Sequence, residues 1–324
     1  MSIKNNHHLQ AQFYLIEAIR QFFRREKFLD VLTPPMVPQP GMEPHIHPFQ
    51  LCRAQTGEKV PYYLHTSPEF AMKELLSHGF KKIFTVGYVF RDEPLSAIHR
   101  PQFLMLEWYR AGSNYRKIMD DCEALYSFCL RFLQQKKISL RVKNKKIKFK
   151  RMTVQQLFQK YLGFDILDYL EKEKLRLLIE KDFKDVPLPA SDLPWDDYFF
   201  LLFLNKIGPH LEEIPYLILD QFPNHLSALA TLTPRDPRVC QRFEIYLHGI
   251  EVGNCFNELT DLKEQQKRFF AQNALKEKCY NYSLPSPEIL FQSLNRGLPP
   301  SSGIAIGVER LLFALTAKEN IFWS

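Results

Sequence analysis

Charged and aromatic residues with chemical potential gather where residues 84–91 and 103–110 are predicted to form two strands joined by a polar loop. The set comprises Arg91, Glu93, His99, Phe103, Glu107 and Tyr109. Alternate residues of paired strands point the same way, so these side chains can share one sheet face. A guanidinium such as that of Arg91 binds phosphate through a forked pair of hydrogen bonds, and Phe103 can stack on a base. The alternative is a solvated hairpin with one aromatic residue in the core.

A second cluster lies in residues 242–261, where three glutamates recur every seven residues: Glu244, Glu251 and Glu258, with Asn254 between the last two. Strand alternation puts Glu244 and Glu251 on one face only if a turn or bulge intervenes, and His248-Gly249 offers one. Two close carboxylates repel unless a cation lies between them, and the Mg²⁺ that accompanies ATP favours carboxylate and phosphate oxygens. The alternative is a charged, exposed face.

The third stretch is the small-residue segment 301–308, which leads into an apolar helix. Small residues let a strand and a helix approach a ligand closely, and Arg310 at the start of the helix can face a nucleotide. Taken alone, this pattern also fits a tightly packed strand-turn-helix.

The elements that must position these residues predict an α+β fold with a largely antiparallel sheet flanked by helices. Helices are expected at 10–27, 66–79, 115–135, 153–161, 171–181 and from 309 onward. Strands are expected at 28–37, 62–65, 84–91, 103–110, 216–223, 242–256 and 303–308, and a basic hairpin at 136–151. No repeat or linker divides the chain, so we expect a single domain over 1–324.

Composition restricts the function classes further. The 324 residues are 45% hydrophobic and 24% charged, as in an ordinary globular protein, and the net charge of +7 is compatible with nucleotides, nucleic acid or an acidic protein partner without choosing among them. The six cysteines form no CxxC pair, as expected of reduced thiols. No apolar signal core opens the chain, and the longest strongly apolar run, 198–204, is too short to span a bilayer. We therefore expect a cytoplasmic protein.

In order and spacing, the stretches resemble the three signature motifs of class II aminoacyl-tRNA synthetases. FLDVLTPPMV resembles motif 1, FRDE with HRPQF and LEWYR resembles motif 2, and GIAIGVERL resembles motif 3. The likeness covers residues 10–315 and is greatest to lysyl-tRNA synthetases, through TSPEFAMK, LEWY and EVGNCFNEL. Those enzymes carry an N-terminal anticodon-binding OB-fold domain, which is not expected here. The chain in this respect resembles the family of elongation factor P–(R)-β-lysine ligases.

The resemblance implies a role for each candidate residue. ATP is expected to contact Arg91, Glu93, His99, Phe103 and Arg310, with Arg91 and Arg310 catalytic, while Glu244 and Glu251 hold Mg²⁺. The amino-acid substrate is expected to contact Ser67, Glu69, Glu107, Tyr109, Asn254, Glu258 and Ala305. The carboxylates Glu69, Glu107 and Glu258 supply complementary charge to the two ammonium groups of a lysine-like substrate.

The resemblance also implies the reaction and the partners. Lysine or (R)-β-lysine is activated by ATP as an aminoacyl-adenylate and passed to a lysine ε-amine of elongation factor P. A homodimer is expected, because motif 1 lies at the dimer interface of the family. The acceptor could instead be tRNA or a small molecule. A third reading is a non-catalytic, synthetase-like regulatory subunit, which the loss of motif arginines or glutamates would favour.

Some positions depart from the family pattern or stay open. Gln102 and Cys255 stand where the family usually has Glu and Gly, and Pro94 stiffens the motif 2 loop, which leaves the acceptor side less defined. Ala305 stands where lysyl-tRNA synthetases usually have Gly, so its methyl group is expected on the pocket floor. The hairpin at 136–151 can meet an acidic partner or simply be solvated. His45 and His47 suggest a metal, but the prolines beside them favour a surface loop.

Overall fold

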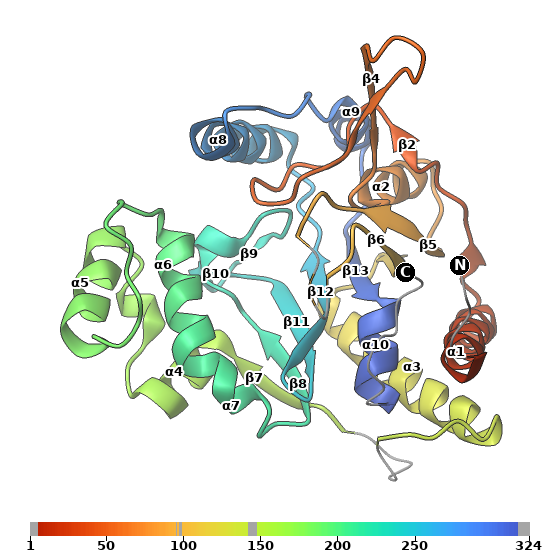
Figure 1. Cartoon of the computed structure of the whole chain (residues 1–324), viewed down its shortest axis with the longest axis horizontal. Helices are drawn as coiled ribbons and strands as arrows, with labels where there is room; N and C mark the ends of the chain where they lie inside the picture. Colours follow the sequence, from red (N-terminus) through yellow and green to blue (C-terminus); the bar gives the residue numbers. More distant parts are fainter. Residues whose placement is uncertain (1–5, 95, 97–98, 142–147, 317–324) are drawn as a thin grey trace. The chain divides into compact units, whose positions relative to one another are not determined.

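A computed structural model describes residues 6–94, 96, 99–141 and 148–316 of the chain. Contacts divide the chain into two units, each of which is described by itself (Figure 1). The first unit comprises residues 1–146 and 257–324, and the second comprises residues 147–256. The expectation of a single domain over 1–324 stays a prediction.

Two long antiparallel strands organise the first unit. β5 (Lys82–Phe90) pairs with β6 (Gln102–Ala111), and β6 pairs in turn with β13 (Ser301–Gly307). At the edge, β1 (Leu29–Asp30) runs parallel to β5. A separate small sheet contains β2 (Met36–Val37), β4 (Lys59–Leu64) and β3 (Gln50–Cys52), in that order.

Helices of the first unit form two groups (Figure 1). α1 (Asn6–Arg25), α3 (Tyr115–Gln135) and α10 (Val308–Thr316) pack on one another or against β6 and β13. α2 (Glu69–Ser77), α8 (Leu262–Tyr280) and α9 (Glu288–Arg296) form the second group, in which α2 contacts β6. Phe23 of α1 packs against Phe84 and Trp108, which joins the first group to the sheet through aromatic contacts.

The second unit combines a sheet with a helical layer. Its strands lie in the order β12 (Ile250–Asn257), β11 (Arg242–Leu247), β8 (Tyr216–Asp220) and β7 (Lys150–Thr153), with a small β9–β10 pair (Leu232–Thr233, Asp236–Cys240). Its helical segments are α4 (Val154–Leu162), η1 (Ile166–Asp168), α5 (Lys172–Asp182), α6 (Trp195–Leu202), the π-helical η2 (Phe203–Ile207), α7 (Gly208–Leu211) and η3 (Asn224–Leu226). Stacked rings of Trp195, Phe199 and Phe158 form part of the core.

The predicted α+β class is confirmed, since helices flank a sheet in which β5–β6, β6–β13, β11–β12 and β8–β11 are antiparallel, whereas β1–β5 and β7–β8 are parallel. The prediction of a basic hairpin is wrong for the described residues of 136–151, because β7 pairs with β8 and residues 138–141 form no strand. Its predicted turn, within 142–147, lies outside the described residues. None of the helices in the described ranges has the length and apolar composition needed to cross a membrane.

Candidate active site

The predicted site residues all lie in described parts of the chain, and the structure assigns them to both units. The second unit holds Glu244, Glu251 and Asn254. The first unit holds the other eleven: Ser67, Glu69, Arg91, Glu93, His99, Phe103, Glu107, Tyr109, Glu258, Ala305 and Arg310. Within each unit the residues form local groups with distinct chemistry.

A buried carboxylate on β6 is at the centre of the first group. Glu107 and Tyr109 alternate onto the same sheet face, and the Tyr109 hydroxyl donates to Glu107 Oε2 at 3.1 Å. From the segment before α2, the Ser67 hydroxyl donates to Glu107 Oε1 at 2.5 Å. On the neighbouring strand Gly303 lies opposite Tyr109, and a Cβ there would be 2.0 Å from the ring. Glycine at 303 therefore makes the space that the Tyr109 ring occupies.

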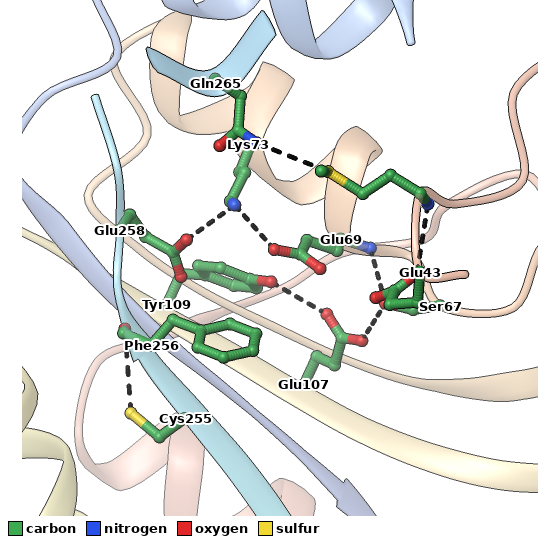
Figure 2. Close-up of polar contacts among 11 residues, drawn as sticks. Glu43, Ser67, Glu69, Lys73, Glu107, Tyr109, Cys255, Phe256, Glu258 and Gln265 are labelled. Carbon is green, nitrogen blue, oxygen red and sulfur yellow. Dashed lines mark hydrogen bonds and ion pairs between the residues drawn. The ribbon is translucent and has the colours of Figure 1, made fainter. Parts of the chain in front are cut away.

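The start of α2 brings a second carboxylate to the same place. Ser67 Oγ accepts the backbone N–H of Glu69 at 3.0 Å, although the N-cap position of the helix is Pro68. One turn along the helix, Lys73 Nζ lies 2.6 Å from Glu69 Oε1 and 2.7 Å from Glu258 Oε2 (Figure 2). Lys73 is fully buried, and Glu258 is only 2% exposed. Ser67, Glu69, Glu107, Tyr109 and Glu258 thus come together in one buried polar cluster, called the pocket below.

Burial and mutual repulsion set the charge of this pocket. Burial first, and then the neighbouring Glu69 carboxylate, raise the pKa of Glu107 to about 8. Burial also raises the pKa of Glu258 to about 8, although Lys73 opposes the shift. For Lys73 the effect of burial, which lowers its pKa, is outweighed by Glu258 and Glu69, so that its pKa is raised. Three carboxylates outnumber one ammonium, so this pocket can bind a further positively charged group.

A second group in the first unit carries the opposite charge. The Arg91 guanidinium lies 5.3 Å from the centre of the Phe103 ring, in the arrangement of a cation–π pair. The pKa of His99 is lowered by burial and then by the positive charges of Arg310 and Arg91, while Glu93 opposes the shift. Arg310 therefore lies within electrostatic range of the motif 2 loop. An arginine beside an aromatic ring, with a second arginine acting on the same loop, suits a nucleotide that carries phosphates.

The hairpin of the second unit confirms the requirement for a turn or bulge. His248 and Gly249 adopt positive φ angles of 51° and 80° in the turn, and the register shifts between Ile245 and Tyr246. Burial first, and then the nearby Glu251 carboxylate, raise the pKa of Glu244 to about 7. The two carboxylates are therefore close enough to repel each other, as a cation-binding pair would be.

Arginine contacts order the residues around Glu244. Arg242 donates to Glu244 Oε1 at 2.6 Å and to Asn254 Oδ1 at 3.0 Å. The Tyr246 hydroxyl donates to the other oxygen of Glu244 at 2.6 Å. These contacts fix Glu244 and Asn254 relative to one another within the hairpin.

The two histidines of the predicted surface loop bond to tyrosines. His45 Nδ1 is 2.8 Å from the Tyr280 hydroxyl, and His47 Nδ1 is 2.5 Å from that of Tyr282. No group of three or more His, Cys, Asp or Glu residues within the described ranges could hold a metal ion by itself. Residues 41–49 lie outside helices and strands and His45 is exposed, which confirms the prediction of a surface loop.

Sequence reasoning missed two residues that shape the pocket, Lys73 and Gly303. Lys73 follows Glu69 by four positions, a spacing typical of solvated helix pairs, so it gave no sign of burial. Gly303 was noted only as one of several small residues. Its specific role follows from the register that places it opposite Tyr109.

Comparison with known proteins agrees with this geometry. The family model for class II tRNA synthetases (D, K and N) matches residues 1–323. Elongation factor P–(R)-β-lysine ligase of Vibrio cholerae is 34% identical over 315 residues, which cover 97% of this chain and 92% of the relative. The ligase of Vibrio vulnificus is 36% identical over 310 residues, with 94% and 90% covered, and that of Yersinia enterocolitica is 34% identical over 310 residues, with 95% and 90% covered. The chain therefore belongs to the class II tRNA synthetase family and, within it, to the elongation factor P–(R)-β-lysine ligases.

Proposed function

We propose that this protein activates (R)-β-lysine with ATP and joins it to a lysine ε-amine of elongation factor P. The observation that carries the proposal is the buried pocket of Glu69, Glu107 and Glu258, which offers negative charge to two ammonium groups at once. An amino acid with one ammonium group would leave a buried carboxylate unpaired, and such a loss discriminates strongly between substrates.

The reaction needs no protein nucleophile. The substrate carboxylate attacks the α-phosphorus of ATP, and pyrophosphate leaves as the new carboxyl–phosphate bond forms. Arg91 and Arg310 stabilise the charge on the phosphate oxygens, and Phe103 stacks on the adenine. A neutral lysine amine of the acceptor then attacks the acyl carbon, loses a proton, and releases AMP as the amide forms. Positioning of the amine next to the adenylate supplies most of the rate.

Mg²⁺ is the metal expected with ATP, and Glu244 and Glu251 fit it. The pKa of Glu244 is raised partly by Glu251, so a cation between them would relieve repulsion. Carboxylate and phosphate oxygens are the ligands that Mg²⁺ favours, and two carboxylates leave positions for phosphate and water. When bound, the ion would neutralise charge on the leaving pyrophosphate.

Cytoplasmic localisation stays a prediction.

The acceptor is tested by offering the enzyme labelled (R)-β-lysine or α-lysine together with ATP, elongation factor P and total bacterial tRNA. We expect label from β-lysine on one lysine of elongation factor P, detected by mass spectrometry. Label that reaches tRNA while elongation factor P stays unmodified would contradict the proposal and favour a tRNA-acylating enzyme. Absence of pyrophosphate exchange with either amino acid would favour the non-catalytic reading.

Arg91→Ala tests the activation step. It should reduce amino-acid-dependent ATP–pyrophosphate exchange by at least about a hundred-fold, because a charge contact made in the transition state contributes several kcal/mol. Arg53→Ala is the matched control, since the Arg53 side chain is 66% exposed on a surface loop. If Arg91→Ala and Arg53→Ala exchange pyrophosphate at the same rate, Arg91 is not part of the ATP site.

We also propose that the enzyme is a homodimer through its motif 1 face. Phe13 and Leu29 are each 51% exposed, Met36 is 53% exposed and Leu32 is 90% exposed, an apolar group unusual for a solvated surface. Sedimentation at micromolar concentration should give a dimer that Leu32→Lys dissociates, whereas Leu177→Lys, at a 57% exposed residue of α5, should not. A monomeric wild-type protein would refute this assembly.

A further inference from the structure

Lys73 is a fully buried cation that the proposed reaction does not use. Its ammonium lies 2.6 Å from one oxygen of Glu69 and 2.7 Å from one oxygen of Glu258. Placing an ammonium in such a position requires compensating charges, and both partners are themselves buried. An interior lysine that only filled space would carry a large desolvation penalty that a methionine would avoid.

Charged and titratable groups face this ammonium from several elements. Glu69 lies on its own helix, Glu258 on the segment that follows β12, and Glu107 and Tyr109 on β6. Glu43, from the loop before β3, acts on Glu69 from the other side. Figure 2 shows the Lys73 ammonium between Glu69 and Glu258, with Glu107 beyond them. When the three pocket carboxylates are ionised, Lys73 leaves two net negative charges.

We infer that Lys73 sets the charge of the amino-acid pocket: its ammonium, 2.6 Å from Glu69 and 2.7 Å from Glu258, makes these carboxylates easier to ionise, so that the pocket can present two net negative charges to the two ammonium groups of the substrate. This inference rests on the proposed function for the identity of the substrate. It makes Lys73 a positioning residue, since it acts through the two glutamates and does not touch the reacting atoms.

Loss of the ammonium should appear as a change in protonation. In Lys73→Met a chain of similar length replaces the lysine without its charge, so Glu69 and Glu258 repel each other, their pKa values rise further, and one of them holds a proton more tightly than in the wild-type protein. The substrate must displace that proton when it binds. The KM for β-lysine should therefore rise about ten-fold for each unit by which the carboxylate pKa rises, with a much smaller change in kcat.

The pH dependence separates this role from a merely structural one. The defect of Lys73→Met in kcat/KM should be greatest near pH 6.5 and shrink toward pH 9, where the glutamates ionise without help. Calorimetry in buffers of different ionisation enthalpy should show about one additional proton released for each β-lysine bound. Lys73→Arg, which keeps the charge, should retain the wild-type pH profile. A defect of equal size at every pH, with an unchanged proton count, would overturn the inference.

Two further measurements keep the test independent of folding and of the substrate. If Lys73→Met does not fold, the double variant Lys73→Met/Glu258→Gln removes the repulsion, and we expect it to fold and to release no additional proton; an additional proton would refute the role. In the substrate-free protein, carbon-13 NMR of glutamate carboxyls should show Glu69 titrating at higher pH in Lys73→Met than in Lys73→Arg, and identical titration would refute it. Failure of the wild-type enzyme to use β-lysine would count against the proposed function alone.

Discussion

Gly303→Ala should displace the ring of Tyr109 and so disturb the amino-acid pocket. Gly303 lies opposite Tyr109 across the β13–β6 pair, and an added Cβ would be 2.0 Å from Cε1 and 2.3 Å from Cδ1 of the Tyr109 ring. Ordinary contact begins at 3.4 Å, so ring and strand must separate by about 1.4 Å. The ring belongs to a buried side chain, and its displacement should break the 3.1 Å hydrogen bond to Glu107.

Two terms give the size of the expected effect. Overpacking of this kind costs about 1–3 kcal/mol of folding stability. A hydrogen bond to a charged group contributes about 1.5–3 kcal/mol, which corresponds to a loss of roughly ten- to 150-fold in kcat/KM if it is made to the substrate-binding carboxylate. Exchange kinetics with β-lysine measure the second term, and urea unfolding measures the first.

Matched variants isolate the cause. Gly87→Ala introduces the same methyl group into β5, where nothing lies within 4 Å, and should change kcat/KM by less than about two-fold and stability by less than about 0.5 kcal/mol. Tyr109→Phe removes the hydroxyl without displacing the ring and should have a smaller effect than Gly303→Ala. If Gly303→Ala behaves like Gly87→Ala, the close approach of Gly303 to Tyr109 is not a feature of the working pocket.

Two further predictions concern Ala305 and Glu309. Ala305 pairs with Glu107 on the same strand face as Gly303, so its methyl group is expected on the pocket floor. Ala305→Gly removes this methyl and should shift the ratio of kcat/KM values toward α-lysine over β-lysine by about 1–3 kcal/mol, and an unchanged ratio would show that the methyl does not determine this selectivity. Burial raises the pKa of Glu309 to about 7, so its contribution to stability is complete below its ordinary pKa and is lost as pH rises through 7. Between pH 5 and 8 the wild-type protein should lose about 2–3 kcal/mol more than Glu309→Gln in urea unfolding, and equal losses would contradict the shift.

Periodic patterns predicted the sheet of the first unit well. The strand pair 84–91 and 103–110 is confirmed as β5 and β6, and the helix 115–135 agrees with α3 at both ends. These elements bury one clear face, so local hydrophobic spacing and tertiary packing favour the same structure. Where local spacing and tertiary packing conflict, the prediction was wrong. Residues around 150 alternate like a strand of a local hairpin, but β7 pairs with β8, which is more than sixty residues away in the chain.

The helical layer of the second unit was not predicted between 195 and 211. Residues 198–204 form an almost continuous apolar run, in which no 3.6-residue period can be recognised. In the structure this run passes from α6 into a π-helical segment, with Phe199 and Phe203 both in the core. Phe200 and Leu204 of this run are exposed although they are apolar, so the outward face has no polar residue to reveal the helical period.

The chemistry of the pocket shows where sequence reasoning stops. Glu107 and Glu258 were found among charged residues of predicted strands and their flanks, and Glu69 was found through the resemblance to lysyl-tRNA synthetases. The burial of Lys73 was not predicted, because Lys73 and Glu69 are spaced as an i,i+4 helix pair. Such pairs are usually solvated and stabilise a helix by only a few tenths of a kcal/mol. The second partner, Glu258, is 185 positions away in the chain and only 2.7 Å away in space. The same two residue types make a weak surface pair in one environment and a charge-setting centre in another, and only the long-range fold determines which. The charge that selects a substrate is therefore a property of the folded pocket as a whole, so adding up the motif residues that line it, without Lys73, gives the wrong net charge.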